Sequence, residues 1–237
     1  MNNDIGIEMT LGAIVTSHPS LARELERRKL DYCCGGAITL GQACRDAGLD
    51  AELVAGELAS SIGDEGPASW AHLDVDDLVA HLVETHHRYL WDELPRLEAL
   101  LDTVVEVHGD RHPELHEIAA CFHAIRADIE PHLVKEERVL FPAIRQLASA
   151  PTAPTFGFGS IGNPISAMLR DHDELGALLQ DLRTSTNDYA VPDDGCASYR
   201  ALFDGLAQLE ADTHLHVHKE NNILFPAAIR MERQLRR

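Results

Sequence analysis

The sequence lacks any segment suited to a membrane. Across its 237 residues no run of 18 apolar residues occurs, so no transmembrane helix is expected. The first ten residues, "MNNDIGIEMT", have neither a basic region nor an apolar core, and therefore predict no signal peptide. We expect a cytoplasmic protein that has no membrane partner.

Positive charge and paired cysteines are also scarce. Twenty Lys and Arg residues stand against 39 Asp and Glu, a net charge of −19, which repels phosphate backbones and excludes nucleic acid as a partner. The five cysteines are odd in number and irregular in spacing, so they do not predict a disulfide framework. A reducing cytoplasm fits this usage.

The chain predicts an all-α protein with two domains. Residues 1–66 are expected to form a small helical domain, and "GDEGPASWAHLD" at 63–74, with two glycines and a proline, predicts the boundary. Long stretches of helical period then predict an antiparallel four-helix bundle over 75–237. The expected helices cover about 75–105, 112–148, 164–187 and 195 to the end.

A repeat inside the bundle carries the chemistry. "HLVKEERVLFPAI" starts at His132 and "HVHKENNILFPAA" starts at His216, and both read H-x-x-K-E-x-x-x-LFPA. His87 precedes the first segment by 45 residues, and His172 precedes the second by 44. The bundle therefore reads as two helical hairpins of one design.

The spacing within the repeat predicts a metal centre. Residues four apart share one face of a helix, so each His and Glu of a segment can bind one ion together. All four histidines are in phase with apolar residues and are expected to point to the core, and the stripe of His132 includes Ile129 and Val139. The candidate ligands for two metals are His87, His132, Glu136, His172, His216 and Glu220. Imidazole with carboxylate suits iron, manganese or zinc, and a two-metal site with open positions favours iron.

The competing interpretation is structural. A single histidine on an apolar face is usually a core residue, but an unpaired buried glutamate is costly. The remaining histidines serve as controls. His86 lies off the apolar stripe to which His87 belongs. His214 and His218 are out of phase with His216 and are expected in solvent. A loose surface set that could hold adventitious zinc comprises His112, His116 and His123.

The stretch "LDYCCGG" places Cys33 beside Cys34. Neighbouring Cα atoms lie about 3.8 Å apart, whereas an unstrained disulfide needs roughly 4.4–6.8 Å. Chemistry with a metal or a partner's sulfur is thus open to the pair, and simple burial of one cysteine is the alternative. Gly35 and Gly36 would let a partner's backbone approach, and Asp31 should oppose thiolate formation. Core or incidental thiols are expected at Cys44, Cys121 and Cys196.

These motifs together resemble a known family. Residues 75–237 are similar to hemerythrin-like di-iron domains, and with "DYCCGG" the whole chain resembles the repair of iron centres (RIC) family, whose N-terminal domain is of the ScdA type. The motifs that carry the resemblance are "DYCCGG", "HLVKEERVLFP", "DHDELG" and "HVHKENNILFP". The resemblance implies two iron ions, bridged by carboxylate and by an oxo or hydroxo group, on the six ligands named above. It also places the family's cysteine pair on Cys33 and Cys34, while "THH" offers His86 beside His87.

The resemblance implies a function in repairing iron–sulfur clusters damaged by nitric oxide or oxidative stress, with iron stored in the bundle and donated, through Cys33 and Cys34, to iron–sulfur client proteins. One alternative is a di-iron enzyme that reduces nitric oxide, nitrite or peroxide, so enzymatic activity stays open. Another is a carrier or sensor of oxygen or nitric oxide. A homodimer is possible.

Overall fold

The computed structural model describes residues 5–62 and 69–236. Within these ranges the chain is helical and has no sheet, only isolated bridges between Thr10 and Thr39 and between Phe156 and Gly159. The all-α prediction is confirmed. Of the predicted boundary at 63–74, residues 63–68 lie outside the described residues. Among the helices that are described, none combines the length and apolarity required to cross a bilayer.

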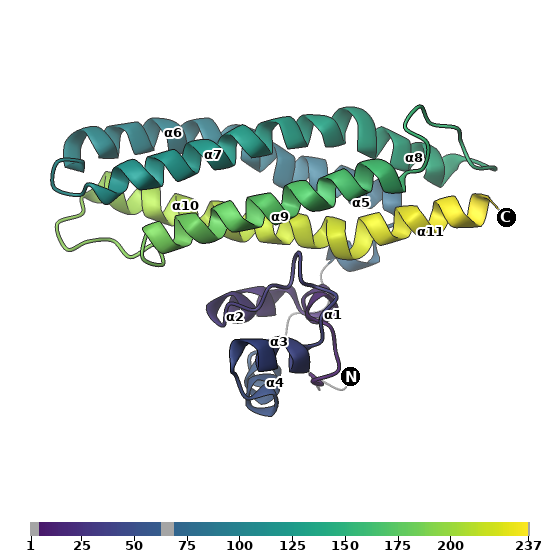
Figure 1. The fold of residues 1–237 in the computed structure, drawn as a ribbon, viewed down its shortest axis with the longest axis horizontal. Coiled ribbons are helices and arrows are strands. Elements are labelled where there is room, and N and C mark those ends of the chain that lie inside the picture. Colours follow the sequence, from purple (N-terminus) through teal and green to yellow (C-terminus); the bar gives the residue numbers. More distant parts are fainter. Residues whose placement is uncertain (1–4, 63–68, 237) are drawn as a thin grey trace. The chain divides into compact units, whose positions relative to one another are not determined.

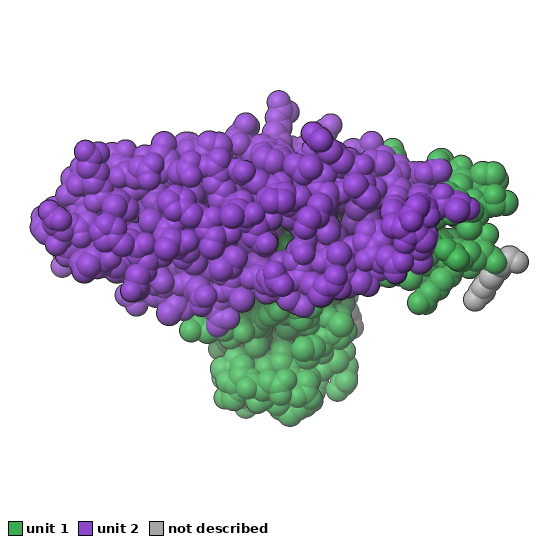
Figure 2. Space-filling view, turned by 45° about the horizontal axis from the view of Figure 1, so that its top comes forward, with its two compact units in different colours: residues 1–79, 147–154, 214–237 green, residues 80–146, 155–213 purple. Residues whose placement is uncertain are grey.

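The chain divides into two compact units, coloured separately in Figure 2. Unit 1 comprises residues 1–79, 147–154 and 214–237, and unit 2 comprises residues 80–146 and 155–213. The predicted small domain, 1–66, therefore shares its unit with the C-terminal residues of the chain.

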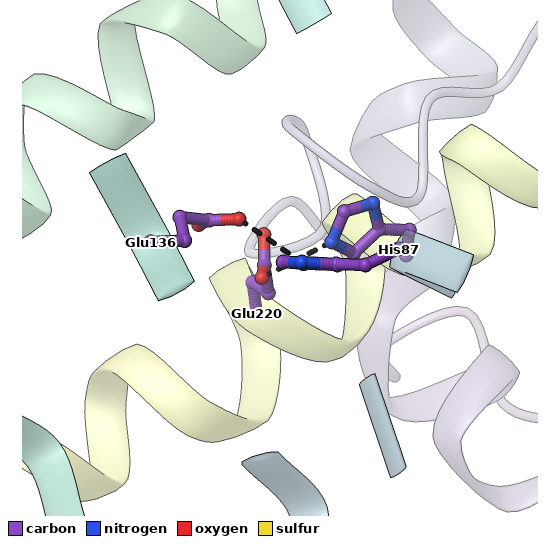
Figure 3. A group of neighbouring side chains, drawn as sticks. His87, Glu136 and Glu220 are labelled. Carbon is purple, nitrogen blue, oxygen red and sulfur yellow. Dashed lines mark hydrogen bonds and ion pairs between the residues drawn. The ribbon is translucent and has the colours of Figure 1, made fainter. Parts of the chain in front are cut away.

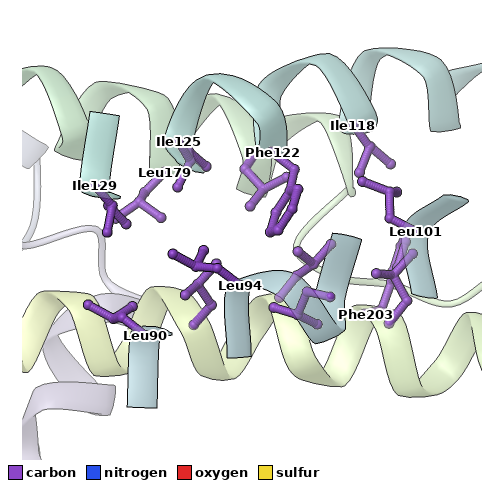
Figure 4. Close-up of a cluster of buried hydrophobic side chains, with 14 of the residues drawn as sticks. Leu90, Leu94, Leu101, Ile118, Phe122, Ile125, Ile129, Leu179 and Phe203 are labelled. Carbon is purple, nitrogen blue, oxygen red and sulfur yellow. The ribbon is translucent and has the colours of Figure 1, made fainter. Parts of the chain in front are cut away.

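Unit 2 contains the helical bundle. In its described residues, four long segments run alongside one another (Figure 1): α6 (Arg88–His108), α7 (Glu114–Lys135), α9 (Gly162–Ser185) and residues 197–213 of α10 (Ala197–Lys219). Together with the helical turns that continue them along the chain, the helical segments cover 75–108, 114–149, 162–185 and 197–235, within a few residues of the predicted ranges. Leucine and isoleucine side chains at helical spacing fill the interior, and Phe122 and Phe203 pack among them (Figure 4).

Three π-helical turns interrupt the long helices, at Val83–His87, Glu136–Leu140 and Glu220–Leu224. In the last two, the amide of the following phenylalanine donates to the carbonyl five residues back, from Phe141 to Glu136 and from Phe225 to Glu220. A proline follows each of these phenylalanines. Because proline has no N–H to donate, it cannot close the ordinary helical hydrogen bond, and this favours the wider turn.

Two of the three prolines in these segments accompany a change of helical register. Pro142 and Pro226 follow π turns, whereas Pro131 lies inside the continuous helix α7. The extra residue in the turn shifts the helical phase, so Val139, expected in the core stripe, is 47% exposed. That part of the predicted stripe is wrong.

Unit 1 places short helices around its own core. The Thr39 hydroxyl caps a helix by accepting from the amide of Gln42 (3.3 Å), and Gly48 ends that helix with a φ of 69°. The helices of this unit include α1 (Leu11–Ser17), α2 (Ala22–Arg27), α3 (Leu40–Ala47), α4 (Ala51–Ser60) and α11 (Phe225–Leu235). The described residues also contain α5 (Val75–Leu82), α8 (Phe141–Ser149) and two short 3-10 helices, Pro19–Leu21 and Ser69–His72.

Asn222 holds the cysteine segment within unit 1. Its side-chain amide donates to the carbonyl of Cys33 (3.0 Å), and it occupies the space beside Gly36. A methyl group on Gly36 would lie 2.3 Å from Asn222 Oδ1 and 2.5 Å from the carbonyl oxygen of Tyr32. The close approach that was expected of a partner's backbone is thus made by a side chain of the same protein.

We expect Gly36→Ala to lower the free energy of unfolding by about 1–3 kcal/mol, the usual cost of overpacking. Gly56→Ala is the matched control, because nothing lies within 4 Å of its added methyl group and alanine favours the helix by up to about 1 kcal/mol. Urea denaturation of both variants measures the difference. Equal stability of the two would show that Asn222 does not fill this space.

Candidate metal centre

Glu136 occupies the centre of the candidate site in unit 2. It begins a π turn and is fully buried. Its Oε2 atom lies 3.4 Å from Nε2 of His87 and 3.4 Å from Nε2 of His132 (Figure 3 draws the first pair). Nε2 of His132 lies 3.1 Å from Nε2 of His172. The structure thus brings together four of the predicted ligands, carried on three separate helical segments of one unit.

Acidic partners on the far side of two imidazoles orient their rings. His87 donates from Nδ1 to Glu137 (2.9 Å), and the indole of Trp91 donates to the same carboxylate oxygen (3.2 Å). His132 Nδ1 lies 3.4 Å from Asp171. When a carboxylate accepts from Nδ1, the Nε2 lone pair is left to face inward, which is the arrangement of metal-binding histidines.

Asp171 also has a cationic partner. Lys135 donates to it at 2.9 Å. Partial burial works against the ionised form of Asp171, but the hydrogen bonds from Lys135 and His132 outweigh it, and the pKa of the carboxyl is lowered. The carboxylate therefore stays charged beside His132. Sequence reasoning missed Asp171 and Glu137, although each is the sequence neighbour of a predicted ligand.

Unit 1 holds the second half of the repeat. His216 lies in α10 and Glu220 begins the π turn that follows, with His216 Nε2 at 3.2 Å from Glu220 Oε1. Glu220 is fully buried and is labelled in Figure 3. The local arrangement is that of His132 and Glu136, as the sequence repeat predicts.

The donor set fits a transition metal. One ligand atom from each of His132, Glu136 and His172 lies within 4.8 Å of the others. Imidazole nitrogens with carboxylate oxygens suit iron, manganese or zinc better than calcium or magnesium. Burying a carboxylate without a compensating cation costs roughly several kcal/mol. A bound cation would therefore explain why Glu136 is tolerated in the interior of unit 2.

The structure separates His87 from its neighbour. His86 points to Asp212, with its Nδ1 atom 2.9 Å from the carboxylate, whereas His87 contacts Glu136. Both histidines are buried. Their contacts assign His87 to the candidate site and give His86 a separate acidic partner.

The prediction that His218 faces solvent is wrong. It is buried in unit 1, where Nδ1 donates to the carbonyl of Tyr32 (3.3 Å) and Nε2 lies 3.2 Å from the Thr16 hydroxyl. Burial lowers the pKa of His218 to about 4, so it is neutral at pH 7. His214 is partly covered and lies 3.4 Å from Glu26. Phase within one helix could not reveal that the N-terminal segment of this unit covers that face.

The cysteine pair is reduced and held by Asp31. The two sulfurs lie 4.0 Å apart, and the Asp31 carboxylate accepts from the amides of Cys33, Cys34 and Gly35 at 2.9–3.0 Å. The hydrogen bond with Cys34, burial and the charge of Asp31 together raise the pKa of the Cys33 thiol. Asp31 therefore opposes the thiolate, as predicted. Its ligand atom and the two sulfurs lie within 4.8 Å of one another.

A helical bundle that buries histidine and glutamate side chains in this way defines a hemerythrin-type cation-binding protein. The family described as "Hemerythrin HHE cation binding domain" matches residues 78–228, and ScdA_N, a domain of unknown function (DUF542), matches residues 7–61. The chain belongs to the repair of iron centres family of hemerythrin-like proteins with an N-terminal ScdA domain. This confirms the resemblance seen in its motifs.

Its relatives include proteins named iron-sulfur cluster repair protein YtfE. The protein of that name from Musicola paradisiaca (strain Ech703) is 33% identical over 228 residues, which is 95% of this chain and 98% of the relative. The one from Escherichia coli O157:H7 is 30% identical over 223 residues, 94% of this chain and 97% of the relative. The likeness therefore extends over both the bundle and the cysteine domain.

We expect Asp171→Ala to weaken metal binding by about 10–100-fold, because His132 loses the carboxylate that orients its ring. Lys135→Ala is the control, since it removes the other partner of Asp171 and leaves the contact between His132 and Asp171 in place. Titration of metal-free protein with ferrous iron gives both affinities. An unchanged affinity in Asp171→Ala would remove this orienting role.

Proposed function

We propose that the chain binds two iron ions on six side chains of its repeat. The proposed ligands are His87, His132, Glu136, His172, His216 and Glu220. A carboxylate has two oxygens, so each glutamate could bridge two ions. The repeat, the burial of both glutamates and the single hemerythrin match over residues 78–228 support this ligand set.

Iron is the proposed metal because of the ligand set, the names of the relatives and the cysteine pair in the same chain. The ligands alone are compatible with manganese or zinc. The relatives, however, are named for iron–sulfur cluster repair, and the same chain carries a pair of adjacent thiols. When bound, iron would supply one-electron redox chemistry and coordination positions open to oxygen or nitric oxide.

The proposed function is repair of iron–sulfur clusters, with stored iron as the cargo and iron–sulfur proteins as clients. The observation that carries it lies in unit 1. Asn222, which binds the carbonyl of Cys33, is two residues from the proposed ligand Glu220. The cysteine pair is thereby tied to the helical turn that carries a ligand, as a donor of iron would require and a simple oxygen carrier would not.

The state of the thiols suits transfer rather than storage. Cys33 keeps its proton beside Asp31, so it would bind iron only after deprotonation, and the resulting binding would be weak and reversible. All five cysteines lie in the described residues, and none of them forms a disulfide there, which agrees with a reducing compartment such as the cytoplasm.

We expect Glu136→Gln and Glu220→Gln to lose most bound iron, while His214→Ala keeps it. The metal-free glutamine variants should also unfold at a higher temperature than the metal-free parent, because a buried charge has been removed. Each kcal/mol gained would raise the midpoint by about 2–4 °C. Elemental analysis and thermal melting measure the two effects. Retention of iron by either glutamine variant would contradict the assignment of that residue.

The repair function is tested by mixing iron-loaded protein with a cluster enzyme whose cluster has been damaged by nitric oxide. Recovery of the enzyme together with loss of iron from the bundle is the expected result. The double variant Cys33→Ala/Cys34→Ala should slow the recovery, while Cys121→Ala serves as the thiol control. Full recovery with the double variant would remove the pair from the function. Steady consumption of nitric oxide with an electron donor, without iron loss, would favour the enzyme instead.

A further inference from the structure

A cysteine–histidine pair lies at the end of unit 2 where α6 ends and α10 begins. Cys196 immediately precedes α10, and its sulfur lies 3.2 Å from Nε2 of His108, the last residue of α6. Cys196 is exposed, so of the two kinds of thiol expected for it, core or incidental, the core alternative does not apply. His108 is only 4% exposed, so a buried imidazole is the partner of an accessible thiol.

This pair is separate from the metal centre. His87 and His108 lie in one continuous helical segment, 21 residues apart. At 1.5 Å per residue, that separation is about 30 Å. His112, His116 and His123 were expected in a loose surface set. Among the described residues, none of them belongs to a group of three or more metal-ligating side chains whose ligand atoms lie within 4.8 Å of one another.

The hydrogen bonds of His108 fix where its proton lies. Arg111 Nη2 lies 3.3 Å from His108 Nδ1. A guanidinium can only donate, so Nδ1 must accept, and a neutral imidazole then carries its proton on Nε2. Nε2 is the atom that faces Cys196. An N–H group pointed at sulfur stabilises the thiolate over the thiol, because the thiolate is the better acceptor.

The start of α10 acts in the same direction. The backbone amides of Tyr199 and Ser198 face the sulfur of Cys196, at the positive end of a 23-residue helix. Hydrogen bonding from the Tyr199 amide is the largest influence on the Cys196 thiol, and with the hydrogen bonds from Ser198 it outweighs the opposing effect of burial, so the pKa of the thiol is lowered.

The nearby carboxylates are already paired. Asp194 lies 2.9 Å from His112 and 3.2 Å from Arg111, and Glu114 lies 3.0 Å from the other nitrogen of His112. The buried ring of Tyr199 packs edge-on against His108. The charged and titratable groups around the pair are therefore Arg111, His112, Glu114, Asp194 and Tyr199.

We propose that Cys196 is a reactive thiolate that forms mixed disulfides with low-molecular-weight disulfides, and that His108 is its positioning residue. The thiolate attacks one sulfur of the small disulfide and forms a new S–S bond. The other sulfur leaves as a thiolate with the electrons of the broken bond. The small disulfide is the only oxidant required, and a small thiol reverses the step.

The other thiols provide references inside the same chain. Burial raises the pKa of Cys121, whose sulfur donates to the carbonyl of Leu178 (3.3 Å). Cys33 is buried and held as a thiol by Cys34 and Asp31, and Cys44 is buried. Selectivity for Cys196 thus follows from its exposure and its two kinds of N–H donor.

The test treats the metal-free full chain with oxidised glutathione and separately with iodoacetamide, and follows each cysteine by peptide mass spectrometry across pH. We expect Cys196 to be modified first and about tenfold faster than Cys121 at pH 7, because each unit of lowered pKa raises the thiolate fraction about tenfold at that pH. The pH at which its alkylation rate reaches half-maximum should lie below the ordinary cysteine value of about 8.5.

Two variants separate positioning from folding. His108→Phe keeps a ring in the buried position but removes the N–H, and Arg111→Ala keeps the imidazole but frees its tautomer. Both should shift the Cys196 alkylation profile to higher pH while the helical circular dichroism is unchanged. A Cys196 rate no greater than that of Cys121 would overturn the proposal. Profiles unchanged in both variants would overturn the role of His108.

Discussion

The burial of two carboxylates governs this structure. Glu136 and Glu220 are fully buried in a chain whose net charge is already −19. An apolar interior would make each of them strongly destabilising unless positive charge or hydrogen-bond donors surround it. The chain brings two imidazoles to Glu136 within 3.4 Å, and one imidazole to Glu220 within 3.2 Å. The surroundings that make the buried glutamates tolerable are therefore the same ones that would bind a cation.

The local backbone serves that requirement. Both glutamates begin π turns, and in both cases a leucine, a phenylalanine and a proline follow. The missing proline N–H favours the wider turn, and the extra residue re-aims the side chains around it. A regular helix would keep Val139 on the core stripe. The π turn instead turns it outward while Glu136 stays inside. The regular period of the α-helix is thus interrupted at the two glutamates of the candidate metal centre.

Much of this was predictable from the sequence, for reasons tied to particular residues. The repeat around His132 and His216 predicts the two hairpins. The i,i+4 spacing to Glu136 and Glu220 keeps its ordinary helical geometry because each π turn begins only at the glutamate. Val139 follows the start of the π turn, so extrapolated phase failed there. His218 was misplaced because helical phase describes one helix, whereas its cover comes from Tyr32 and Thr16, nearly 200 residues away in sequence.

The cysteines show how environment divides one residue type between opposite chemical states. Cys33 lies beside a carboxylate and a second thiol in a buried segment, and its pKa rises. Cys196 lies at a helix start, beside an imidazole N–H, and its pKa falls. Neither difference can be seen in the sequence, because it depends on which hydrogen-bond donors and charges the fold places next to each sulfur. A thiol that must release a soft cation benefits from staying protonated, whereas one that must attack a disulfide benefits from being ionised. The two environments therefore suit two different kinds of sulfur chemistry in one chain.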